Sequence, residues 1–235
     1  IYGGNVAGAG TFVFDTDNYQ VDEVATNVTV TIRRLGGTSG TSAGPNVSVT
    51  FSTSDGTALS DTDHQAVTNY DTVVTNLVFP PGEVVQSVTI PVFRDYIISP
   101  DLTVNLNLSD PRPQVADGPE IGNYTASLTI LNDDGALSFS SDSYAAPENI
   151  ASGSALITLV RSGSSRLPAS VQFVTTSTGT AIPNVNYLPV TNAVPFAAGQ
   201  SSGSVFVPLV DDPLVTGDLT VGMQLVNPKN KIGRA

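Results

Sequence analysis

The 235-residue chain contains no cysteine and no tryptophan, and its only histidine is His64. Without cysteine, disulfide bonds, thiolate metal sites and cysteine catalysis are excluded. One histidine cannot supply the several ligands of a zinc enzyme, and it is the sole histidine base for a serine hydrolase. No glycine-rich phosphate loop follows a strand and opens a helix, and no tryptophan offers a platform for a sugar. We therefore expect no enzymatic activity.

Charged side chains are also scarce, at 13% of residues, and their balance is strongly acidic. Nine basic residues oppose 21 acidic ones, which gives a formal net charge of −12. Such a field repels phosphate backbones and anionic lipid, so nucleic acid is excluded as an expected partner, as is charge-driven docking on a membrane. No run of eighteen apolar residues occurs, and the sequence therefore predicts no membrane-spanning helix. The excess of acidic residues has two interpretations: they keep the protein soluble, or they cluster to bind cations.

The chain opens on Ile1-Tyr2-Gly3-Gly4 without a methionine, and no signal peptide is recognisable. We expect it to be a mature or excised fragment of a longer protein that is secreted or displayed on a cell surface. An extracellular chain without disulfides must obtain its stability from a large core, a metal ion or neighbouring domains.

Thr, Ser, Asn, Val and Gly are abundant, a composition typical of β-sheet proteins. Apolar and polar residues alternate with the strand period of two, as in Val28, Val30 and Ile32. Thr11–Phe14 and Tyr19–Val21 are interpreted as one broken first strand. The further predicted strands cover residues 28–32, 47–51, 73–79, 84–93, 102–108 and 124–131. Short strands separated by turns predict an all-β fold of immunoglobulin-like antiparallel β-sandwiches.

The second half of the sequence repeats the first. Phe14, Asp17, Tyr19 and Glu23 recur in the same order and spacing as Phe139, Asp142, Tyr144 and Glu148, and Gly56-Thr57-Ala58 recurs as Gly179-Thr180-Ala181. Matched landmarks in a fixed order indicate duplication of one module. We therefore predict an N-terminal arm over residues 1–10, a first sandwich over 11–134 and a second, C-terminally incomplete sandwich over 135–235.

The incomplete copy is visible at the C-terminus. After Ile121-Gly122 the first module continues into a closing strand over 125–131, whereas after Ile232-Gly233 the second stops at Ala235. The second module should therefore lack its last strand, which leaves a sheet edge and part of its core open. Two interpretations remain: the chain is truncated, or a neighbouring chain donates a strand, with residues 1–10 as one candidate donor.

These landmarks resemble the Calx-beta module, an immunoglobulin-like sandwich found in sodium/calcium exchangers, integrin β4 and many large bacterial surface proteins. The matching motifs are Phe14-x4-Tyr19-x3-Glu23, Val49-x-Phe51-x-Thr53-x-Asp55-Gly56-Thr57-Ala58, Phe79-x2-Gly82-Glu83, Ile90-Pro91-Val92 and Ile130-x-Asn132-Asp133-Asp134. His64 stands beside Asp63 where the family has tyrosine, so a solvated or packing role is expected for it.

The resemblance implies a calcium-binding cluster of acids at one end of the first sandwich. The corresponding positions are Glu23, Asp55, Asp61, Asp63, Asp95, Asp101, Asp133 and Asp134. Calcium takes six to eight hard oxygen ligands and tolerates irregular geometry, which suits acids brought together by loops. The alternative is that these aspartates are turn residues that bond to their own backbone.

Two departures from the family weaken this expectation. The stretch around Asp95 is poorer in acid than in the exchangers, so fewer ions or weaker binding is expected. The second module keeps only Glu148, Asp211, Asp212 and Asp218 of the acidic set.

Three functions follow as hypotheses. The leading one is a non-enzymatic, calcium-binding extracellular module pair of a larger surface, adhesive or filamentous protein, in which calcium stiffens the joint between modules. Its partners would be neighbouring domains, other copies of the same protein or an extracellular ligand. The second is a structural fibre subunit that assembles by β-strand donation, with calcium incidental. The third is a regulatory calcium sensor, against which the thin acidic cluster argues.

Overall fold

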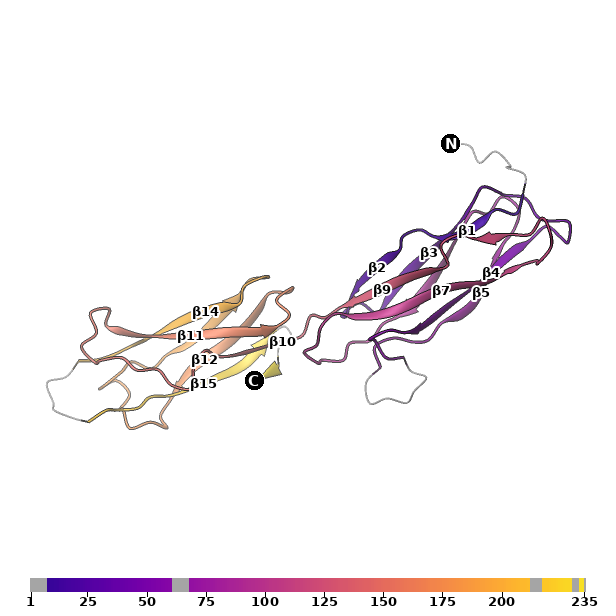
Figure 1. Ribbon diagram of the computed structural model, residues 1–235. Helices are drawn as coiled ribbons and strands as arrows, with labels where there is room; N and C mark the ends of the chain where they lie inside the picture. The colour runs from indigo at the N-terminus through magenta and orange to yellow at the C-terminus, as the bar shows by residue number, and fades with distance from the viewer. Residues whose placement is uncertain (1–7, 61–67, 212–216, 230–232, 235) are drawn as a thin grey trace. The chain divides into compact units, whose positions relative to one another are not determined.

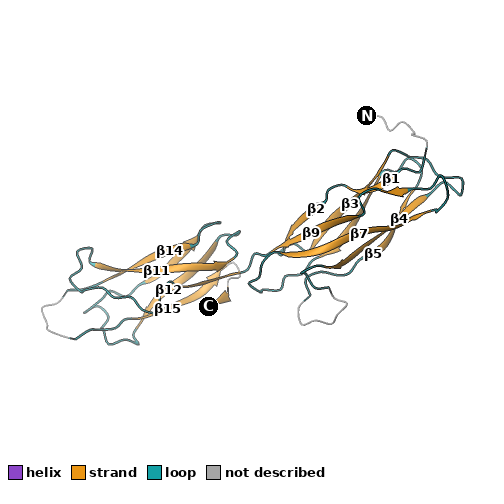
Figure 2. Cartoon of the chain, viewed as in Figure 1, coloured by secondary structure: helices purple, strands orange, loops and turns teal. Residues whose placement is uncertain are grey.

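The computed structural model describes residues 8–60, 68–211, 217–229 and 233–234 (Figure 1). These residues form strands and loops, and no helix occurs among them (Figure 2). Accordingly, the described part of the chain offers no apolar helix of membrane-spanning length. Asp61, Asp63 and His64, together with residues 1–7 of the predicted arm, lie outside the described residues.

Contacts divide the chain into two compact units. The first comprises Ile1–Asp95 and Ser99–Asn132, and the second comprises Tyr96–Ile98 and Asp133–Ala235. Each unit is a β-sandwich with its own core, as the duplicated sequence predicts.

The first sandwich is built from two sheets. One sheet contains β1 (Thr11–Phe14), β3 (Asn27–Leu35), β6 (Val85–Pro91) and β8 (Glu120–Ile121), in the order β6-β3-β1-β8. The other contains β2 (Asn18–Asp22), β4 (Val47–Asp55), β5 (Val74–Phe79), β7 (Leu102–Arg112) and β9 (Thr125–Leu131), in the order β2-β9-β7-β4-β5. The alternating apolar side chains face inward, and Phe12, Phe51 and Leu128 are fully buried between the sheets.

The immunoglobulin-like all-β fold is confirmed, but its first strand was misread. Residues 11–14 and 19–21 do not form one interrupted strand, because β1 pairs with β3 in one sheet and β2 pairs with β9 in the other. The turn between them carries the chain across the sandwich. The β1·β8 and β2·β9 pairs are parallel, whereas the remaining pairs of this unit are antiparallel. Strand β8 lies within a stretch predicted to be a loop.

The recurring Gly-Thr-Ala motif has a structural cause. A Cβ atom on Gly56 would lie 2.5 Å from the carbonyl oxygen of Thr103, so only glycine fits this close approach. Thr57 N then donates to Thr103 Oγ1 at 3.1 Å, and Ala58 N donates to Thr103 O at 2.9 Å. The motif thereby fastens the loop after β4 to the beginning of β7. Thr220 accepts the same two bonds from Thr180 and Ala181 in the second unit.

The second sandwich is a shortened copy of the first. One sheet contains β10 (Gly135–Phe139), β11 (Ser154–Gly163), β14 (Ser202–Pro208) and β16 (Gly233–Arg234), in the order β14-β11-β10-β16. The other contains β12 (Ala169–Thr176), β13 (Thr191–Phe196) and β15 (Gly222–Lys229), in the order β13-β12-β15. Among the described residues no counterpart of β9 follows β15.

Candidate metal centre

Three carboxylates come together, each from a segment that follows a strand of the first sandwich: β2, β6 or β9. Glu23, Asp95 and Asp134 each offer one oxygen, and these oxygens all lie within 4.8 Å of one another. Glu23 is 5% exposed and Asp134 is 2% exposed, while Asp95 is half-buried. Close carboxylates repel one another unless a cation neutralises them, and repulsion is stronger away from bulk water.

The parallel pairing of β2 with β9 brings Glu23 near Asp134. Asp22 lies opposite Leu131 at the end of this ladder, and the Glu23 backbone N–H donates to the Leu131 carbonyl at 3.1 Å. In a parallel pair both strands end at the same edge, so the residues that follow β2 and β9 emerge together. Glu23 and the Asn132-Asp133-Asp134 run therefore leave β2 and β9 at the same edge of the sheet.

Antiparallel pairing of β3 with β6 brings Asp95 to Glu23 as well. Pro91, the last residue of β6, lies opposite Asn27, the first residue of β3. The next residue, Val92, donates its backbone N–H to Thr26 at 3.2 Å. The segment that leaves β6 thus meets the segment that leads from Glu23 into β3.

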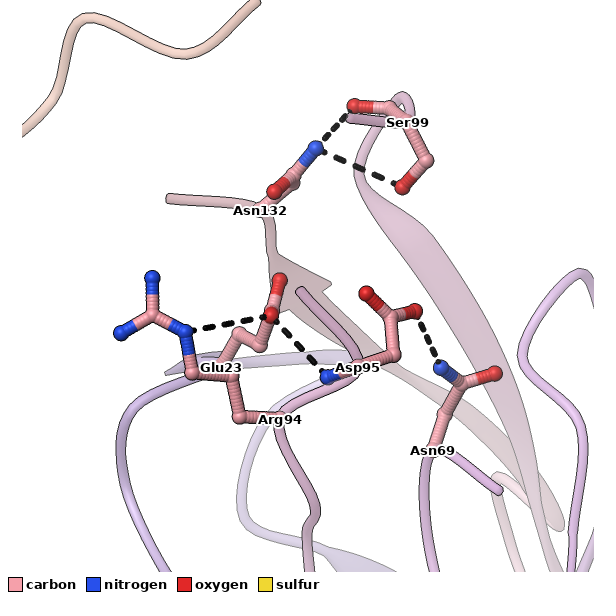
Figure 3. Close-up of polar contacts among 6 residues, drawn as sticks. All are labelled: Glu23, Asn69, Arg94, Asp95, Ser99 and Asn132. Carbon is pink, nitrogen blue, oxygen red and sulfur yellow. Dashed lines mark hydrogen bonds and ion pairs between the residues drawn. The ribbon is translucent and has the colours of Figure 1, made fainter. Parts of the chain in front are cut away.

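Polar contacts hold two of the three carboxylates in place (Figure 3). The Asp95 backbone N–H donates to Glu23 Oε1 at 3.3 Å, and Asn69 Nδ2 donates to Asp95 Oδ2 at 2.9 Å. Asn69 is itself buried, and its Oδ1 accepts the Leu59 N–H at 2.9 Å. The loop after β4 is thereby connected to the carboxylate group through one amide side chain.

A basic side chain also enters the group. Arg94 Nε lies 3.8 Å from Glu23 Oε1, and the two side chains are 12% and 6% exposed (Figure 3). The guanidinium offsets part of the negative charge, and it would compete with a bound cation for Glu23.

Of the six predicted ligands that lie among the described residues, the structure brings these three together. Asp55 Oδ1 accepts hydrogen bonds from the Tyr70 hydroxyl at 2.6 Å and from the Ser60 N–H at 3.1 Å. These bonds hold the loop after β4 in place. Asp101 is exposed, and its Oδ1 accepts the Asn132 N–H at 2.9 Å. Asp133 is buried next to Asp134 but is not a member of the group. Asp61 and Asp63 lie outside the described residues.

Three residues that matter at this site were not predicted. Asn69 and Tyr70 lie beyond the acidic loop, where no motif marks them, and Arg94 was noted only as part of a stretch poor in acid. Asn132 was predicted as part of the Ile130-x-Asn132-Asp133-Asp134 motif without a role of its own. It lies over the beginning of β7, where its Nδ2 donates to the Ser99 carbonyl and its N–H donates to Asp101 (Figure 3).

The Tyr70–Asp55 hydrogen bond predicts a stability change at high pH. Burial, together with the Asp55 carboxylate, raises the pKa of Tyr70 well above the ordinary value of about 10. The folded chain therefore keeps a proton that the unfolded chain loses, so this contribution is present below pH 10 and is lost as pH rises above it. Tyr70→Phe should cost about 1–3 kcal/mol at neutral pH and flatten the decline in stability above pH 10.

Urea unfolding between pH 7 and pH 11 measures this effect. Tyr124→Phe, a change at an exposed tyrosine, is the matched control and should leave both the midpoint and the pH slope unchanged. Equal behaviour of the two variants would show that the Tyr70 hydroxyl contributes nothing.

The second unit does not reproduce the carboxylate group in its described part. Glu148, Asp211 and Asp218 are exposed, and no second set of three acidic or histidine ligands comes together among residues with described positions. Asp212 lies outside them.

Fold and site together define a class of protein: tandem immunoglobulin-like sandwiches with an acidic cluster at the end of the first. The family profile described as "Calx-beta domain" matches residues 7–134 and again 131–233, and the chain belongs to this family. No curated protein matches the sequence.

Solved structures of the same family are similar at low sequence identity. CBD12 from CALX1.2 is 22% identical over 93% of this chain and 80% of that chain, with a TM-score of 0.48. The calcium binding domain CBD12 of CALX1.1 is 21% identical over 92% and 80%, also with a TM-score of 0.48. The apo-form Calx CBD1 domain is 28% identical over 53% and 97%, with a TM-score of 0.44.

Proposed function

We propose that the first module binds calcium through Glu23, Asp95 and Asp134. The observation that carries the proposal is the convergence, within 4.8 Å, of one oxygen from each of three carboxylates that come from separate parts of the fold. Carboxylates are the hard oxygen ligands that calcium prefers, and backbone carbonyls and water commonly complete its shell. Family membership supports the same assignment, since a relative of this family is titled a calcium binding domain.

We further propose that the chain is a non-enzymatic module pair of a larger extracellular protein with a surface, adhesive or filamentous role. Asp134 belongs to the short segment that joins the two family-matched modules, so an ion that binds it would restrain that segment. Its partners would be neighbouring domains or other copies of the same protein. A single site with Arg94 in it suits the weak affinities, with Kd of about 10⁻⁴–10⁻³ M, that are typical of extracellular modules.

Thermal unfolding with millimolar calcium, and again with excess chelator, tests this proposal. A ligand that binds only the folded state stabilises it by RT ln(1 + [L]/Kd), about 2.7 kcal/mol at a hundredfold excess over Kd. A raised Tm in calcium alone is the expected outcome, and magnesium at equal concentration should have a smaller effect. Identical melting in calcium and in chelator would overturn the proposal and leave the acids as turn residues.

Arg94→Gln should change affinity and calcium-free stability in opposite directions. Removing a positive charge that lies 3.8 Å from Glu23 should strengthen calcium binding by at least about fivefold, because even a solvent-screened charge at this distance contributes about 1 kcal/mol. The same change should lower Tm in chelator, since Glu23 loses its ion pair.

Calorimetric titration and melting of the variant measure both quantities. Arg33→Gln, a change at an exposed arginine of the first sandwich, is the charge-matched control. Weaker calcium binding in Arg94→Gln would show that Arg94 assists the site rather than competing with the ion.

A further inference from the structure

Strand β5 forms one edge of the five-stranded sheet in the first sandwich, whose order is β2-β9-β7-β4-β5. No strand of the described residues pairs with its outer side. An open edge presents main-chain N–H and C=O groups with which another strand can pair. Natural edges are often protected by charged residues or proline, and β5 contains neither.

Three residues of β5 direct their main-chain groups away from the sheet. The Thr53 N–H donates to the Val73 carbonyl at 2.9 Å, one residue before β5 begins. Hydrogen-bonded pairs alternate along an antiparallel ladder, so Val74, Asn76 and Val78 point their N–H and C=O groups outward. Their side chains lie on the solvent face of the sheet, where Val74 is 68% exposed and Val78 is 41% exposed.

The second sandwich has the same edge in a protected form. The Thr175 N–H donates to the Val190 carbonyl at 3.0 Å, so the outward residues of β13 are Thr191, Ala193 and Pro195. They take the same three places as the outward residues of β5, since each strand ends on the phenylalanine that follows the third of them. Proline has no N–H, so β13 cannot present the full set of donors.

The outward row of β5 is complementary to itself about Asn76. When two copies of the strand pair antiparallel with Asn76 opposite Asn76 of the second copy, each Val74 lies opposite a Val78. The valines then cover one another on the solvent face, and the central amide side chains can hydrogen-bond to each other. The Val78 carbonyl already accepts Gln86 Nε2 at 3.1 Å, but a carbonyl oxygen can accept a second donor.

We infer that β5 of one chain pairs antiparallel with β5 of a second copy, in a two-fold contact that joins their five-stranded sheets edge to edge. A contact of this symmetry closes at the dimer. Six-residue strands bury less than the roughly 1,200 Å² of a stable interface, and each chain has a net charge of −12, so the contact is weak. Many copies on a larger surface or fibre protein would strengthen it through multivalency.

The inference rests on the proposed function only in taking a copy of the same protein as the partner, and it requires no calcium. Sedimentation and hydrogen exchange of the full chain in chelator, at chain concentrations up to about 1 mM, therefore test it separately. The expected result is a reversible dimer. Exchange of the Val74, Asn76 and Val78 amides should slow as the chain concentration rises, because these N–H groups become paired.

Two variants of β5 should each weaken the dimer by at least about tenfold. Val78→Pro copies Pro195 and removes an outward N–H, so unfolding in urea should stay close to that of the wild type. Asn76→Lys places two like charges opposite each other at the two-fold axis. Ala193→Lys is the matched control, since it adds the same charge at the corresponding exposed place of β13, and it should leave the dimer unchanged.

Three results would contradict this pairing. One is a monomer at about 1 mM chain, a concentration that detects even weak complexes. Another is protection of the same amides at every concentration, which would show that a different part of the chain covers the edge. The third is equal weakening by Asn76→Lys and Ala193→Lys, which would place the contact elsewhere. If Val78→Pro fails to fold, Asn76→Lys still decides, because Asn76 is exposed and lies outside the core.

Discussion

Glu23→Gln combined with Asp134→Asn should abolish the calcium-dependent rise in Tm while leaving a folded first module. The two changes remove two of the three converging carboxylates and keep side chains of the same size. At a hundredfold excess of calcium over the wild-type Kd, the variant should lose most of the roughly 2.7 kcal/mol that binding contributes. In chelator two opposed changes set its Tm, because repulsion among the acids is relieved while the Glu23–Arg94 ion pair is lost.

Two matched variants separate ligands from other acids. Asp55→Asn changes a predicted ligand that lies outside the carboxylate group, and Glu148→Gln changes the exposed counterpart of Glu23 in the second unit. Both should keep the full response to calcium in a melting experiment or a calorimetric titration. If Asp55→Asn lost the response and the double variant kept it, the assignment of the site to Glu23, Asp95 and Asp134 would be wrong.

Leu128→Ala should destabilise the first module by about 2–5 kcal/mol, the largest single-residue effect that we expect. Leu128 is fully buried between the two sheets, so its truncation to alanine leaves a cavity there.

Thr129→Ala is the control for that experiment, since Thr129 points to the other face of the same strand. It should change stability by no more than about 1 kcal/mol. Urea unfolding, with hydrogen exchange in β7 and β9 to assign the transition to the first module, measures both variants. Equal losses would show that the strand acts through its backbone pairing rather than through the buried side chain.

Several features of the fold could be predicted because they are local. Alternation in Val28, Val30 and Ile32 marks a strand with one buried face, whatever lies against it. The order of the repeated landmarks predicts two modules, and the family profile matches the chain in two segments. The turn between Phe14 and Tyr19 was misread because a period of two cannot distinguish a bend within a sheet from a crossing between sheets.

The carboxylate group shows where sequence reasoning stops. The family motifs predicted eight acidic ligands, and carboxylates are suitable ligands for calcium. The motifs do not indicate which of these carboxylate oxygens lie close together in the fold. The convergence of the oxygens depends on the parallel pairing of β2 with β9, because the residues that follow these strands, Glu23 and Asp134, then lie at the same edge. It also depends on the turn after β6, which contains Asp95. The same geometry turns Asp55 toward Tyr70 and introduces Arg94.

By itself, then, the sequence determined the all-β class, the duplication and the kind of side chain available for a hard cation. The tertiary structure alone decided which three carboxylates converge and which basic side chain lies beside Glu23. The physical reason is that strand periodicity and the order of the repeats depend only on residues close together in the sequence. Convergence depends on strand register and loop paths that join residues distant in the chain.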